Sequence, residues 1–140
     1  MIGKSIEELK VGDKASFTKT ITETDVYLYA GVSGDLNPAH INQVEAEKSM
    51  FKGRIAHGML TASLISTVLG CYLPGPGTIY LGQNLKFKKP VRFGDTITAV
   101  GEVISLDTDR NKAVLKTTCY NQNDEVVIEG EATCMPPKKA

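Results

Sequence analysis

The stretch GMLTASLISTVL, at positions 58–69, is the part of the sequence that decides the fold. Its apolar residues surround the helix axis instead of forming one stripe, and a helix that is apolar all round is typical of a protein core. Gly70 and the run LPGPG at 73–77 end this helix, because glycine and proline interrupt helical backbone. The segment therefore predicts one buried central helix.

Alternating side chains on either side of this helix predict an antiparallel sheet. Residues 15–21 form the first strand-like pattern, in which Ala15, Phe17 and Ile21 alternate with the polar residues 16, 18 and 20. Further patterns of this kind follow the helix, at 78–88, 97–106, 113–121 and 126–135. One strand, a buried helix and then several consecutive strands imply an α+β domain whose antiparallel sheet wraps around the helix, which is the hot-dog fold.

Two shorter helices are predicted between the first strand and the central helix. Thr22 and Asp25 offer side chains that cap a helix, and residues 26–33 continue at helical spacing up to Gly34. Residues 35–38 cannot extend this helix, since the residue before a proline is driven out of the helical region. The second short helix is predicted around 44–50.

Length and composition narrow the class of protein. The 140 residues predict a single domain over 1–140, and the 16 basic and 16 acidic residues cancel. Neither nucleic acid nor a membrane is therefore expected as a partner. The apolar stretch at 59–73 is shorter than the about 20 residues of a membrane span, and the N-terminus lacks the apolar run of a signal peptide. Three widely spaced cysteines without a CxxC pair favour reduced thiols in the cytoplasm over disulfides or a metal site.

The segment YAGVSGDLNPAH, at 29–40, concentrates the side chains that are suited to chemistry. Asp35 and His40 are five residues apart around a turn that contains a proline, so they can converge on one point. A carboxylate and an imidazole that hold the same water suit general acid–base catalysis near neutral pH. The alternative is ordinary turn chemistry, in which Asp and Asn side chains cap backbone amides and the histidine lies at the surface.

This segment closely resembles the hydratase motif of the MaoC-like (R)-specific enoyl-CoA hydratases. The likeness continues through IAHGML at 55–60, through 80–91 and through 94–97, so it covers most of the chain in the family's order. The resemblance implies a hot-dog fold and identifies Asp35 and His40 as the catalytic pair.

The same resemblance implies three further site residues. Asn37 matches the motif asparagine that holds the loop, and Ser66 matches a helix serine near the catalytic site. Gly58 matches the glycine whose amide binds the thioester oxygen. Physical chemistry supports this role for Gly58, because a helix N-terminus offers unpaired amides and a partial positive charge to a developing oxyanion.

The activity that this resemblance implies is hydration of a short- to medium-chain trans-2-enoyl-CoA to the (R)-3-hydroxyacyl-CoA. No cofactor and no metal are expected, and the resemblance implies a homodimer. Three alternatives stay open. They are a 3-hydroxyacyl dehydratase acting on acyl-carrier-protein thioesters, a hot-dog thioesterase, and a module that binds acyl thioesters without turning them over.

Two secondary features have two interpretations each, and a third has one. His57 either contributes to the site or is a loop histidine that bonds backbone or an interface partner, and we favour the second. The basic residues Lys86, Lys88, Lys89, Arg92 and Arg54 either bind the phosphates of CoA or form a solvated charged surface. The packing around Leu69 and the last strand is expected to set the depth of the acyl pocket.

Overall fold

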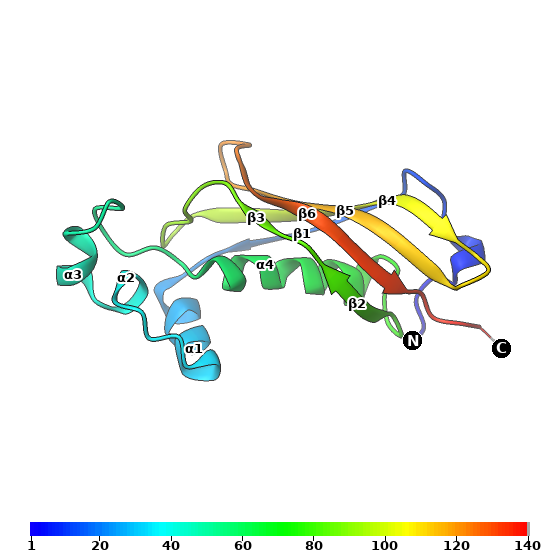
Figure 1. Cartoon of the computed structure of the whole chain (residues 1–140), viewed down its shortest axis with the longest axis horizontal. Helices are drawn as coiled ribbons and strands as arrows, with labels where there is room; N and C mark the ends of the chain where they lie inside the picture. Colours follow the sequence, from blue (N-terminus) through cyan, green and yellow to red (C-terminus); the bar gives the residue numbers. More distant parts are fainter. Residues whose placement is uncertain (140) are drawn as a thin grey trace.

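The structure is a computed structural model that describes residues 1–139, and it consists of an antiparallel sheet packed on one long helix (Figure 1). The long helix, α4, runs along one face of the sheet, with the shorter helices α1, α2 and α3 at one end and both termini at the other. The elements in chain order are η1 (Ile6–Glu8), β1 (Lys14–Thr20), α1 (Glu23–Ser33), α2 (Pro38–Ile41), α3 (Gln43–Glu47), α4 (Gly58–Thr67), η2 (Val68–Tyr72), β2 (Ile79–Gln83), β3 (Lys86–Phe87), β4 (Thr96–Asp107), β5 (Lys112–Tyr120) and β6 (Val126–Met135).

The sheet has the strand order β1-β4-β5-β6-β2, with the short β3 also paired to β6. Every pairing is antiparallel, and β1 and β2 form the two edges. The predicted α+β class and the antiparallel sheet around a central helix are therefore confirmed. The strands predicted at 97–106, 113–121 and 126–135 correspond to β4, β5 and β6 with ends that differ by at most one residue.

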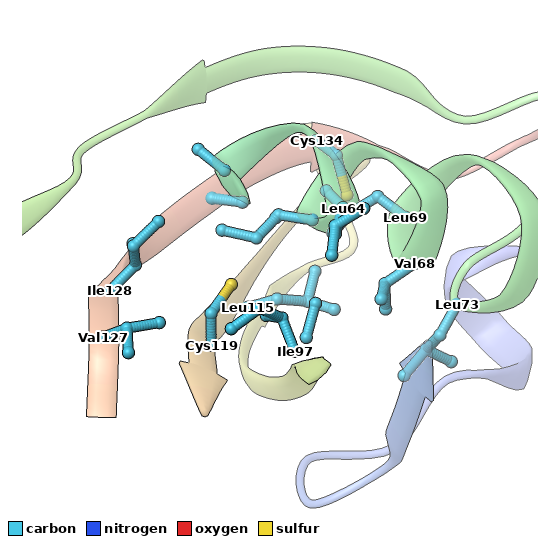
Figure 2. Close-up of a cluster of buried hydrophobic side chains, with 14 of the residues drawn as sticks. Leu64, Val68, Leu69, Leu73, Ile97, Leu115, Cys119, Val127, Ile128 and Cys134 are labelled. Atoms are coloured by element: carbon cyan, nitrogen blue, oxygen red, sulfur yellow. The ribbon is translucent and has the colours of Figure 1, made fainter. Parts of the chain in front are cut away.

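The hydrophobic core lies between α4 and the sheet (Figure 2). Leu64, Val68 and Leu69 extend from the helical side toward the side chains of β4, β5 and β6, among them Leu115 and Ile128. All five are at most 5% exposed. Each buried aliphatic side chain of this kind contributes about 1.5–3 kcal/mol through removal of apolar surface from water.

Two of the three free cysteines belong to this core. Cys119 and Cys134 are fully buried, whereas Cys71 is exposed. Burial raises the pKa of the Cys119 thiol to about 12 and that of Cys134 to about 11, since the thiolate loses its hydration. Both thiols therefore act as small apolar side chains.

The central helix is not buried on every side. Its sheet-facing side chains are covered, and η2 continues the helical path to Tyr72, but Met59, Ser63 and Ser66 are exposed. The prediction of a helix buried all round is therefore wrong for one side of it within this chain. The sequence shows that apolar residues surround the helix axis. It does not show whether other segments of the same chain cover each side of the helix. No helix among residues 1–139 is both long enough and apolar enough to cross a membrane.

The strand predicted at 78–88 is interrupted. Asn84 leaves the ladder, donates its backbone N–H to the Glu131 carbonyl (3.0 Å) and accepts the Glu131 N–H on its side-chain oxygen (3.1 Å). Because one side chain replaces a regular ladder bond here, the segment divides into β2 and β3. The result places Phe87 of β3 beside the start of α4.

Replacing a core leucine tests this packing. Leu115→Ala should lower the free energy of unfolding by about 2–5 kcal/mol, because it removes fully buried methyl groups and leaves a cavity. Urea denaturation measures the change. Leu28→Ala is the matched control, since Leu28 is 63% exposed on α1 and its truncation should change stability by less than about 0.5 kcal/mol. Equal losses for the two variants would contradict the described core.

Candidate active site

The turn between α1 and α2 sets the position of Asp35. Gly34 ends α1 in the left-handed conformation, with φ of 80°, which glycine adopts without strain. The Asp35 N–H donates to the Ser33 hydroxyl (3.1 Å), and the Asp35 carboxylate accepts the Asn37 N–H (3.2 Å). The helix cap at Thr22 and the stop at Gly34 that the sequence predicts are both present.

The short helix α2 carries His40, where the sequence analysis expects only a turn. It starts at Pro38, and the Asn37 side chain caps it by accepting the Ala39 N–H (3.0 Å). Proline suits the first helical position because its missing N–H has no intrahelical partner there. Asn37 therefore bonds at both ends of the turn between Asp35 and His40.

Residue Ile55 fixes the orientation of the His40 ring. His40 is 8% exposed, and its Nδ1 lies 2.7 Å from the Ile55 carbonyl oxygen. Because a carbonyl oxygen accepts only, Nδ1 is the donor, and Nε2 is left to interact with a ligand. The Ile55 N–H in turn donates to the Ala39 carbonyl (3.0 Å), so the segment before α4 is bonded to α2 twice.

His57 connects these elements at the start of α4. Its Nε2 donates to the backbone carbonyl of Asp35 (3.0 Å), and its ring stacks on that of His40 with centroids 3.9 Å apart and planes 30° apart. The ring of Tyr29 contacts it from α1 at 4.7 Å. A nitrogen or oxygen atom from each of Asp35, His40 and His57 lies within 4.8 Å of the other two. His57 does bond backbone, but it also lies within the candidate site, so the favoured interpretation, which kept it apart from the site, is wrong on that point.

Gly58 is the first residue of α4, and the N-cap His57 makes no side-chain bond to the helix amides. The first amides of a helix have no intrahelical acceptor and carry the positive end of the helix dipole. A side chain on Gly58 would meet the Phe87 ring, since a Cβ there would lie 2.6 Å from its Cε1 atom. A side chain at this position would therefore require the Phe87 ring to move away from the helix terminus.

A cavity of about 520 Å³ opens in front of these residues. Asp35, His40 and Gly58 are among the residues that line it. Much of the remaining wall is apolar and comes from Met50, Phe51, Ile55, Met59, Phe87 and Ile128. Leu69, by contrast, is 1% exposed and packs in the core, so it is not part of this wall.

The structure brings Asp35, His40 and Gly58 together, with Asn37 supporting them, but it does not bring Ser66 to the same place. Ser66 follows Gly58 by eight residues, which is about 12 Å along a helix. Its side chain lies on the exposed side of α4, outside the cavity wall.

The basic residues near the cavity differ in the groups that they contact. Lys88 and Lys89 line the cavity and pair with Glu129 (3.2 Å) and Glu125 respectively. The hydrogen bond from Lys89 holds the pKa of Glu125 below its ordinary value. Arg54 is used inside the fold, where it pairs with Glu23 (3.1 Å) and stacks over Phe93.

Sequence reasoning missed the contribution of three residues, His57, Phe87 and Thr61, which all line the cavity. His57 meets Asp35 across 22 residues, and Phe87 meets Gly58 across 29, so spacing along the chain carries no signal of either contact. Thr61 is fully buried one turn after His57. The position of His57 next to Gly58, directly before the buried helix, is the one local signal of its role.

A sheet wrapped around one helix, with a carboxylate and an imidazole meeting at the N-terminus of that helix, defines a hot-dog-fold protein with an Asp–His site. The family model of the MaoC like domain matches residues 8–126, and the chain belongs to this family.

Its relatives include characterised hydratases and dehydratases. Over 133 residues the chain is 54% identical to an (R)-specific enoyl-CoA hydratase of Rhodospirillum rubrum. The aligned region makes up 95% of this chain and 92% of that relative. It is 46% identical over 133 residues to a 3-hydroxybutyryl-CoA dehydratase of Methylorubrum extorquens, and the aligned region makes up 95% of this chain and 84% of that relative. Among solved structures it is similar to the unliganded R-hydratase PhaJ1 from Pseudomonas aeruginosa, with a TM-score of 0.92, 44% identity, and 98% and 88% coverage.

Removing the α2 cap tests how the loop is held. Asn37→Ala should lower the free energy of unfolding by about 0.5–2 kcal/mol, because the Ala39 amide loses its acceptor. Asn37→Asp keeps an acceptor oxygen and should retain most of the stability. Thermal denaturation of both variants measures this difference, and equal losses would contradict a capping role.

Proposed function

We propose that this protein is an (R)-specific enoyl-CoA hydratase, which reversibly adds water to a short- to medium-chain trans-2-enoyl-CoA to give the (R)-3-hydroxyacyl-CoA. One observation carries the proposal. Asp35, His40 and Gly58, the first residue of α4, all line one largely apolar cavity, and a side-chain oxygen of Asp35 and a ring nitrogen of His40 lie within 4.8 Å of each other. The named activities of the relatives at 54% and 46% identity support the same reaction class.

The proposed mechanism places the thioester oxygen at the Gly58 amide. This amide and the helix dipole stabilise the negative charge that develops on that oxygen when water attacks C3. A water molecule bound by the Asp35 carboxylate and by Nε2 of His40 supplies the attacking oxygen, which forms the new bond to C3. The acid–base pair takes one proton from this water and delivers a proton to C2 on the same face.

The acyl chain occupies the apolar part of the cavity, between Met59 of α4 and Ile128 of β6. Apolar walls with a few placed polar groups are typical of small-molecule sites. The CoA phosphates lie near Lys88 and Lys89, with Lys86 next to them in sequence. Arg92 is not included, because its guanidinium donates to the carbonyls of Phe51 and Gly53. Arg54 does not take part, because its guanidinium is engaged by Glu23 and Phe93.

Substituting the acid–base pair tests the activity. Asp35→Asn and His40→Gln should each slow hydration of crotonyl-CoA by about a hundredfold or more, which is the usual size of such contributions. Loss of the enoyl-thioester absorbance gives the rate, and chiral analysis should give the (R)-3-hydroxy product. Asp109→Asn, an exposed substitution in the loop between β4 and β5, is the control and should leave the rate unchanged.

The same assay separates the alternatives. A faster rate with carrier-protein thioesters would favour the dehydratase of fatty acid synthesis, and thiol release from a saturated acyl-CoA would favour a thioesterase. Binding of enoyl thioesters without turnover would support the non-catalytic module. An (S)-product would contradict the proposed stereochemistry even if turnover were fast.

We further propose that the protein acts as a homodimer in the cytoplasm. The edge strand β2 pairs with β6 on one side, and Ile79, Tyr80 and Leu81 on it are 56%, 38% and 47% exposed. An unpaired apolar edge is normally covered, and a second copy supplies a matching edge. The buried thiols of Cys119 and Cys134 suit a reducing compartment.

Light scattering after gel filtration tests the dimer. The wild type should have twice the 15.1 kDa chain mass. Leu81→Lys should shift it toward the monomer, because a charge at the centre of the edge must be desolvated on pairing. Val11→Lys is the control, since Val11 is 66% exposed in the turn before β1. A wild type of single-chain mass would overturn the proposal.

A further inference from the structure

His57 lies where the catalytic loop, the catalytic histidine and the start of α4 meet. We propose that His57 is a positioning residue, which holds the Asp35 backbone and the His40 ring in fixed geometry relative to the Gly58 amide. The inference rests on the proposed hydratase function and adds a residue that this function does not include. His57 acts through Asp35 and His40, and it takes no proton from substrate.

The bond from His57 to Asp35 links the catalytic loop to the central helix. The other hydrogen bonds described for Asp35 are local, to the Ser33 hydroxyl and from the Asn37 amide. The bond from Nε2 of His57 to the Asp35 carbonyl spans 22 residues. Since the carbonyl belongs to the peptide unit next to the Asp35 Cα, this bond fixes the point from which the carboxylate extends.

Aromatic contacts hold the His57 ring from two directions. His40 stacks on it at 3.9 Å, and Tyr29 contacts it at 4.7 Å with a 56° tilt. The ring is 2% exposed, so it cannot rotate without moving one of these neighbours. Its orientation therefore sets the position of the His40 ring as well as that of Asp35.

The two imidazoles carry their protons on opposite nitrogens. His40 donates from Nδ1 to the Ile55 carbonyl, and His57 donates from Nε2 to the Asp35 carbonyl. Nδ1 of His57 is buried and has no hydrogen-bond partner among residues 1–139. A proton on Nδ1 in place of Nε2 would leave the Asp35 carbonyl without this donor, so the contact itself selects the tautomer.

Kinetics of His57 variants test the positioning role with crotonyl-CoA. His57→Phe keeps an aromatic ring but has no donor, and it should lower kcat by about tenfold to a hundredfold, as small misplacements of catalytic groups do. KM should stay within about threefold of the wild type, since no substrate contact is lost. His57→Gln keeps an N–H donor and should retain more activity than His57→Phe.

A double-mutant cycle distinguishes positioning from a general loss of stability. In an Asp35→Asn background, His57→Phe should lower kcat by a smaller factor than it does in the wild type, because one of the two groups that it positions is already removed. Fully multiplicative losses, or a kcat of folded His57→Phe equal to that of the wild type, would overturn the proposal.

The histidine spectrum gives a test that does not depend on activity. The chain contains two histidines, so ¹⁵N–¹H correlation of the imidazole rings yields two spin systems, and a His57 variant assigns them. The wild type should show His40 protonated at Nδ1 and His57 at Nε2. A His57 ring protonated at Nδ1 alone would overturn the proposal. A wild type with this spectrum but without turnover of any enoyl thioester would refute the proposed function and leave the His57 contact intact.

Discussion

The packing of α4 against the concave face of the sheet is the constraint on which the rest of the structure depends. Leu64 and Ile65 of the helix meet fully buried side chains of three strands, so the helix has one allowed position along the sheet. Its N-terminus is fixed from outside by the bond from the Ala56 N–H to the Val91 carbonyl (2.8 Å). The site uses this fixed end, because the amide of Gly58 is oriented by a helix that the core holds in place.

The placement of Asp35 and His40 depends on elements that are too short to be stable alone. The helix α2 has four residues, far fewer than the about 12–15 that an isolated helix needs. It exists because Asn37 caps one end and because Ile55 bonds both to Ala39 and to His40. Local turn chemistry thus places Asp35 and His40 near each other, and long-range bonds from the segment before α4 make this placement rigid.

Much of the fold could be predicted from the sequence because its signals are local. Alternation defines β4, β5 and β6, and the apolar run at 58–69 defines the central helix. The interruption at Asn84 could not be predicted, since it depends on a bond to Glu131 that lies 47 residues away. The sequence also could not predict that one side of α4 is exposed, because apolar composition does not show which side of a helix lacks a covering layer.

The sequence predicted the site residues that lie close together in one short motif. It did not predict those that are far apart in the sequence and come into contact only in the folded chain. Asp35, Asn37 and His40 lie within six residues, and Gly58 begins the most conspicuous helix of the sequence. The roles of His57 and Phe87 depend on contacts between distant segments, and Ser66 lies away from the cavity in this chain.

The origin of the cavity walls has a consequence for how this protein can change over evolutionary time. Asp35, His40 and Gly58 come from one continuous segment between α1 and the start of α4, whereas part of the apolar wall comes from β3 and β6. Substitutions in the strands can reshape the space for a ligand while the chemical groups keep their geometry. The two halves of the site can therefore diverge independently, which allows one reaction to be adapted to many ligand sizes.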